Sequence, residues 1–236
     1  MLMRSTRGIA LVAVLLLSVL VVTVALGLSL ILGTNHLAVR NAREATALAH
    51  AAAAGIELAA HALADADWQV VLAGAVQAPG VDGPPWGVKR LEDGDTIDAG
   101  AQTSLLNCGA ASGCLVDQLR AVSPERPWGL NNPTWRLFLY GPLSRFAAFR
   151  HAPAAYVLVW VADDGREHDD DPEHDGGDDG SGGHILRLRS VAIARGQGRR
   201  GFEAEAIRVC RASSGTLACQ PGIRVQSWRD IRWSVS

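Results

Sequence analysis

The sequence predicts an α+β fold in which a long N-terminal helix is followed by a mainly antiparallel β-sheet head. Residues 9–32 carry no charge and continue into an alanine-rich stretch with helical spacing of its larger apolar residues. After the alanine-rich stretch, the segments that are rich in β-branched and aromatic residues all lie beyond residue 134. Helical and strand segments are therefore segregated along the chain, which is typical of the α+β class.

The N-terminus predicts a membrane anchor. Residues 1–8 form a basic leader whose only charges are Arg4 and Arg7 and which ends at Gly8, directly before the apolar run. Residues 9–32 would make a helix of about 36 Å, which is long enough to cross the apolar core of a bilayer. The run is also longer than the apolar stretch of about 7–15 residues in a cleaved secretory signal. Because the arginines lie on the short N-terminal side, we expect the leader in the cytoplasm and the rest of the chain outside.

Residues 33–77 are predicted to extend this helix as an amphipathic stalk. The stretch contains no proline and is rich in alanine, the best helix former. Larger apolar residues recur at Leu48, Ile56 and Leu63. Pro79 and Gly80 are expected to end the helix, so that residues 78–236 form the head.

Strands are expected in the second half of the head. The segments with strand character are residues 135–140, 156–162, 185–194, 202–209 and 223–235. Residues 81–153 are otherwise rich in glycine and proline and are expected to be largely irregular. Residues 163–184 are acidic and lack large apolar side chains, so we interpret them as a solvated loop between two strands that pair.

The four cysteines predict disulfides, because the head is expected in an oxidising compartment. Their spacing favours two local pairs, Cys108 with Cys114 and Cys210 with Cys219, although crossed pairings remain open. Neither pair has the short gap that is typical of a zinc knuckle, so no metal site is favoured at the cysteines.

The acidic loop has two alternative interpretations. Calcium binds carboxylate and carbonyl oxygens on flexible loops, but the spacing here does not follow the EF-hand pattern. A solvated spacer is therefore favoured and no cofactor is expected, with calcium as the alternative. A transition-metal site is a weaker one. The candidate calcium ligands are Asp163, Asp164, Asp169, Asp171 and Asp175, and the histidines are His168, His174 and His184.

No enzymatic function is expected. The sequence contains no nucleophile elbow, H-E-x-x-H pair, Walker loop or dinucleotide-binding fingerprint. A net charge of −2 gives no indication of a nucleic-acid partner. The arginines of the C-terminal half are interpreted as the polar faces of strands, with DNA binding as the less favoured alternative.

Three stretches carry a resemblance to a known family. Residues 7–17 resemble the opening of PilX-like minor pilins of the type IV pilus. Residues 41–44 (Asn-Ala-Arg-Glu) and 51–58 (Ala-Ala-Ala-Ala-Gly-Ile-Glu-Leu) are similar to the signature that follows in that family. The order of strand, acidic insert, strand, glycine-rich turn and strand in residues 156–206 resembles the end of some larger relatives. The N-terminal resemblance covers about residues 4–60.

The resemblance implies a pilin-like fold and a role in filament assembly. It implies cleavage after Gly8 by a prepilin peptidase, so that the mature, N-methylated chain begins at Ile9. The implied location is the inner membrane with the head in the periplasm, and later the cell-surface pilus, with other minor and major pilins as partners. The fifth mature residue is Ala13, where most major pilins have glutamate, which implies a priming or tip subunit. The alternatives are a pseudopilin of type II secretion and a single-pass membrane protein with a ligand-binding extracytoplasmic domain.

Overall fold

The computed structural model forms two compact units, Met1–Glu44 and Ala45–Ser236. It describes residues 7–124, 126–146, 154–167, 169–175, 184–194, 198–208, 210–213, 216–219 and 222–231, of which residues 7–10, 210–213 and 216–219 are described by their backbone alone.

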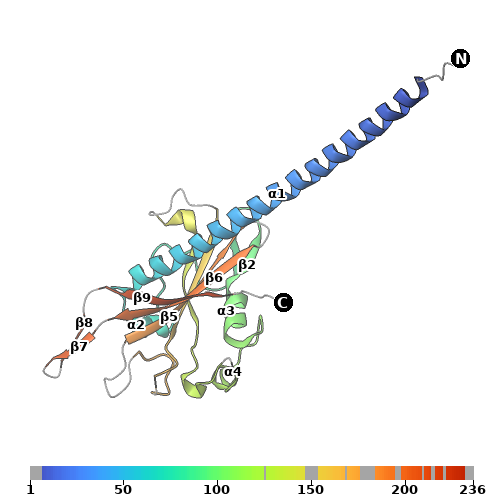
Figure 1. Cartoon of the computed structure of the whole chain (residues 1–236). Helices are drawn as coiled ribbons and strands as arrows, with labels where there is room; N and C mark the ends of the chain where they lie inside the picture. The colour runs from blue at the N-terminus through green and yellow to red at the C-terminus, as the bar shows by residue number, and fades with distance from the viewer. Residues whose placement is uncertain are drawn as a thin grey trace, which may run out of the picture. The chain divides into compact units, whose positions relative to one another are not determined.

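The first element is helix α1 (Arg7–Leu63), which begins in the first unit and ends in the second (Figure 1). Its large apolar side chains between Leu11 and Val39 are exposed. One 18-residue window reaches a mean hydropathy of 3.0, and none of it is buried. By length and composition, α1 could therefore span a membrane. The long N-terminal helix that the sequence predicts is present.

Helix α1 ends at Leu63, well before the expected end of the stalk. The short helix α2 (Trp68–Leu72) follows, and the side chain of Asp67 caps its N-terminus. The Trp68 indole donates a hydrogen bond to the Leu63 carbonyl oxygen at 3.0 Å, and Arg208 donates to the same oxygen at 3.0 Å. The carbonyl group of Leu63 lies at the end of α1, where no following helical turn supplies an amide donor. The Trp68 and Arg208 side chains donate to it instead.

The second unit contains a five-stranded antiparallel sheet in the order β3-β4-β5-β6-β9. Two short hairpins, β1-β2 and β7-β8, lie outside it, and Figure 1 shows the β7-β8 hairpin extending away from the sheet. The α+β class that the sequence predicts is confirmed, with a mainly antiparallel head. The strands are β1 (Val88–Arg90), β2 (Thr96–Asp98), β3 (Arg136–Pro142), β4 (Tyr156–Asp163), β5 (His184–Ile193), β6 (Arg199–Arg208), β7 (Cys210–Ser213), β8 (Thr216–Cys219) and β9 (Arg224–Ile231).

Strand β4 is buried along its whole length because both faces of the sheet are covered. On one face Val157 and Val159 belong to the same core cluster as Ile56 of α1. On the opposite face, Trp160 belongs to a second cluster with Ile97. Successive residues of a strand point to opposite faces, so a nearly continuous apolar segment is expected for a strand between two layers.

Residues 80–150 contain helices that the sequence does not predict. Asp98 accepts a hydrogen bond from the Ala101 amide and so caps α3. The Trp160 indole donates to Thr103 Oγ1 at 2.9 Å, which attaches α3 to the sheet. These elements are α3 (Ala99–Cys108), α4 (Val116–Arg120) and the 3₁₀ turns η1 (Gly129–Asn131) and η2 (Leu143–Arg145).

The two outer strands of the five-stranded sheet are irregular or covered. In β9 the register against β6 shifts between Glu203 and Glu205, and Ser227 has a φ of 57°. Along the outer edge of β3, the Ala78 amide donates to the Phe138 carbonyl oxygen at 2.8 Å. The segment after α2 therefore pairs with the free side of β3.

Candidate functional site

The acidic segment after β4 is folded onto the head, which corrects the expectation of a fully solvated spacer. Asp163, Asp164, Glu167 and Asp175 are buried. The turn between them approaches the head closely at Gly165, where a Cβ atom would lie 2.9 Å from the ring of Trp128. A glycine thus lets this polar turn pack against an aromatic surface. Residues 168 and 176–183 of the expected loop lie outside the described part.

Three of these carboxylates meet at one point. One oxygen from each of Asp163, Glu167 and Asp175 lies within 4.8 Å of the others. Asp163 Oδ1 and Asp175 Oδ1 are buried and have no hydrogen-bond partner. Burial, followed by the charge of Glu167, raises the pKa of Asp163 to about 9. We call Asp163, Glu167 and Asp175 the carboxylate cluster.

Among the basic residues near the carboxylate cluster, His184 binds the second carboxylate oxygen of Asp175, and Arg166 binds a residue outside the cluster. His184 Nδ1 lies 2.7 Å from Asp175 Oδ2, on the oxygen opposite the unpartnered Oδ1. Burial raises the pKa of Asp175, while the bond and charge of His184 and the charges of Arg208 and His174 act in the opposite direction. Arg166, the basic residue closest in sequence, forms an ion pair with Glu205 at 3.3 Å instead.

The sequence-based candidates are only partly brought together. Among the described residues, Asp163 and Asp175 join the carboxylate cluster. Asp169 Oδ2 lies 3.2 Å from His174 Nδ1 and Asp171 is exposed, so neither belongs to the described group of three. Asp164 is buried beside the cluster and accepts a 3.4 Å hydrogen bond from the Arg166 amide.

Glu167 is the cluster residue that sequence reasoning missed. It lies four positions after Asp163, with a glycine between them that permits a tight turn. His174 and His184 each pair with a different aspartate, and His168 lies outside the described residues. The described histidines therefore do not assemble into one site.

A second charged group lies between neighbouring strands β5, β6 and β9. Glu203 forms ion pairs with Arg187, Arg189 and Arg229 at 2.5, 2.7 and 3.0 Å, respectively. Burial alone would raise the pKa of Glu203, but Arg187 and Arg189 lower it to about 2. The interpretation of these arginines as simple polar strand faces is incomplete, because Arg187 and Arg189 surround a buried acid.

A groove of about 530 Å³ lies beside this group and is lined in part by Trp128, Trp135, Arg187 and Arg189. The arginines that line it bind protein groups. Arg187 and Arg189 bind Glu203, while Arg126 donates to the carbonyl oxygens of Asn107 and Pro133. The groove is therefore built around internal ion pairs and hydrogen bonds.

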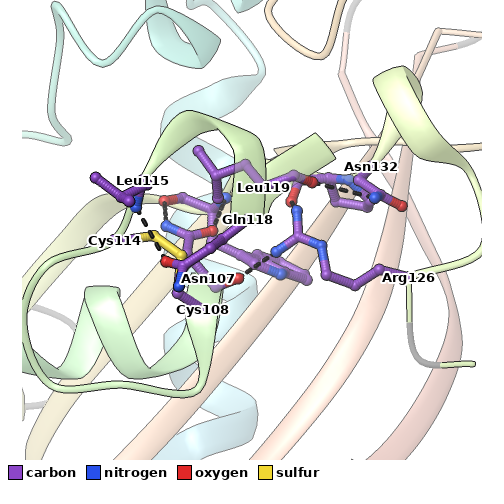
Figure 2. The surroundings of a disulfide bond; sticks show 10 residues. Asn107, Cys108, Cys114, Leu115, Gln118, Leu119, Arg126 and Asn132 are labelled. Carbon is purple, nitrogen blue, oxygen red and sulfur yellow. Dashed lines mark hydrogen bonds between the residues drawn. A yellow bond between two sulfur atoms is a disulfide. The ribbon is translucent and has the colours of Figure 1, made fainter. Parts of the chain in front are cut away.

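A disulfide joins Cys108 to Cys114, the first of the two expected local pairs. Figure 2 shows Asn107 beside this bond, and its side chain binds both the amide and the carbonyl group of Trp135, at 2.8 and 3.0 Å. The disulfide thus holds the end of α3 where Asn107 reaches the start of β3. The backbone register places Cys210 opposite Cys219 in the β7-β8 hairpin, but their side chains lie outside the described part.

Replacing Cys108 and Cys114 with serine should lower the free energy of unfolding by about 2 kcal/mol, because the disulfide closes a short loop in the unfolded chain. Denaturant unfolding with and without reductant measures this change. Reductant should destabilise the parent chain more than the double variant. Equal stability of the two oxidised proteins would contradict the expected contribution.

Gly8 and Ile9, the residues at the expected processing site, lie in the first turn of α1. In comparisons with protein-family models, curated proteins and solved structures, nothing matches this chain.

Proposed function

We propose that this chain is a minor pilin that takes part in type IV pilus assembly as a priming or tip subunit. The observation that supports this proposal best is the division of α1. Its N-terminal part exposes apolar side chains such as Leu15 and Leu30, whereas Ile56 and Leu63 near its end are buried against the sheet. One helix thus offers an apolar surface for other subunits and also anchors the head.

Packing, rather than chemistry, would perform this function. The exposed apolar side chains of the N-terminal part of α1 are unfavourable in water and require a bilayer or another apolar partner. Before assembly, the inner membrane covers it, with the head in the periplasm. In a filament, the helices of other minor and major pilins replace the lipid. Ala13 leaves the start of the helix without a carboxylate, which suits a subunit that begins or caps a filament.

A prepilin peptidase is the enzyme that this proposal requires. Co-expression of the full chain with an active peptidase should yield a mature protein that begins at Ile9, because cleavage after Gly8 removes the charged leader and leaves the apolar helix intact. Intact-mass measurement of membrane-extracted protein identifies the new N-terminus and its methylation.

A Gly8→Val variant should retain the leader, because the peptidase recognises the small residue before the cut. Gly27→Val is the matched control, since Gly27 lies within the same helix and meets no neighbouring atom within 4 Å. The peptidase is verified on one of its own prepilins. A parent chain that still begins at Met1 in that experiment, or that is cut after residue 32, would exclude the pilin proposal.

The pseudopilin alternative shares this processing and needs a second test. Cysteines introduced at Leu15 and Leu30 should crosslink to pilins when the chain is expressed with the minor pilins of a type IV pilus. Crosslinks that form only with components of a type II secretion system would favour a pseudopilin. Correct processing without crosslinks to either set would favour the ligand-binding alternative.

A further inference from the structure

The carboxylate cluster at the end of β4 indicates a function that filament assembly does not require. We propose that Asp163, Glu167 and Asp175 bind one calcium ion, which fastens the acidic segment to the end of β4. Asp163 is only 3% exposed, and its buried Oδ1 atom has no hydrogen-bond partner.

The spacing of the three carboxylates suits one central ion. Their ligand oxygens lie within 4.8 Å of one another. Calcium binds oxygen at about 2.3–2.6 Å, so two ligands on opposite sides of one ion lie up to about 5 Å apart. The oxygens are therefore close enough to share one ion without a large movement of the backbone.

The electrostatics of the cluster also favour a cation. Within the described part of the chain, no arginine or lysine forms an ion pair with Asp163 or Asp175. Several acids in one buried place repel each other, and each loses its hydration. A calcium ion would compensate this charge and satisfy the unpartnered oxygens of Asp163 and Asp175.

The donors favour calcium over other divalent ions. Carboxylate oxygens are hard ligands, whereas structural zinc sites use cysteine and histidine. His184 Nδ1 is already paired with Asp175 Oδ2, so this nitrogen orients the carboxylate and does not face the ion. Magnesium requires a smaller, nearly octahedral shell and retains several waters. Bidentate carboxylates can supply the larger calcium shell.

Thermal unfolding of the full chain in detergent tests the site. With excess chelator as the reference, a saturating concentration of calcium should raise the melting temperature by about 5–10 °C, because the ion binds the folded state alone. Equal concentrations of magnesium and zinc should give clearly smaller shifts. A shift of the same size with magnesium would show a general ionic effect and overturn the calcium assignment.

Asp163→Asn should abolish the calcium-dependent shift. Asp171→Asn is the matched control: it makes the same change in the same segment at an exposed position and should keep the parent shift. No calcium shift in the parent chain, or an unchanged shift in Asp163→Asn, would refute the site.

Radioactive calcium in equilibrium dialysis gives an independent count. The parent chain and Asp171→Asn should each bind one ion, and Asp163→Asn should bind none. Glu167→Gln provides a second cluster variant if Asp163→Asn fails to fold, and it should lose the same ion. Retention of one tightly bound ion in a folded cluster variant would overturn the proposal. This test does not depend on leader cleavage, so it can fail while the pilin proposal stands.

Discussion

Replacing Gly55 with valine should destabilise the second unit by about 3 kcal/mol or more, because it forces α1 away from the sheet. Gly55 is buried where α1 crosses β4 and β5. A Cβ atom there would lie 2.5 Å from Ser190 Oγ and 2.6 Å from Val157 Cγ1. Neither neighbour can move freely inside the core, so the helix must shift. Denaturant unfolding, followed by tryptophan fluorescence, measures the loss.

Two variants distinguish this contact from a general effect of valine in a helix. Gly27→Val makes the same change on α1 where no atom lies within 4 Å, and it should change the stability of the head by less than about 1 kcal/mol. The Oγ atom of Ser190 is buried and has no hydrogen-bond partner, so Ser190→Ala should itself cost little. In a double variant, Ser190→Ala should also restore part of the stability that Gly55→Val loses. Strictly additive effects would show that the side chain introduced at position 55 does not clash with Ser190.

Glu203→Gln should cost about 3–5 kcal/mol, because it leaves Arg187 and Arg189 close together without a counter-charge. The loss should also appear as a pH dependence of the parent chain. The folded pKa of Glu203 lies near 2 instead of 4.5, so Glu203 is more acidic in the folded state. Its contribution of about 3 kcal/mol is present above pH 4.5 and is lost as the pH falls toward 2, because the unfolded chain binds the proton first.

Unfolding of the parent chain and of Glu203→Gln across this pH range isolates the contribution, since other titrating groups are common to both. The two stability curves should converge as the pH falls. Glu205→Gln is the control on the same strand, because Glu205 pairs with Arg166, whose side chain is 68% exposed. That change should cost less than about 1 kcal/mol. Parallel curves for the parent and Glu203→Gln would contradict the low pKa.

The sheet was the most predictable part of the fold, and the end of the long helix was not. Strand β4 could be predicted because its β-branched residues stop sharply at an acidic turn. The end of α1 depends on Arg208, which donates to Leu63 from the far end of the chain. A local pattern contains no information about such a donor, whereas alanine-rich sequence favours a longer helix. Helix α3 was missed because its sequence has weak helical periodicity.

The candidate site was less predictable than the fold. The acidic composition of the segment indicated Asp163 and Asp175, which the structure brings together with Glu167, but the same composition indicated a solvated loop. The segment approaches the head where Gly165 lies against Trp128, and these two residues are far apart in the sequence. Glu167 gave no separate signal among so many acids. Packing of the segment against the head decides which carboxylates meet. Local composition does not predict packing against a distant aromatic residue.

The two outer strands of the five-stranded sheet, β3 and β9, determine whether heads can pair with one another through their sheets. A neighbour cannot readily add a strand beside β9, because Ser227 interrupts its regular hydrogen bonding and Arg229 and Asp230 are exposed there. The opposite border is occupied by the segment that bonds Phe138. Heads held at high local concentration should therefore resist strand pairing through the two outer strands of this sheet.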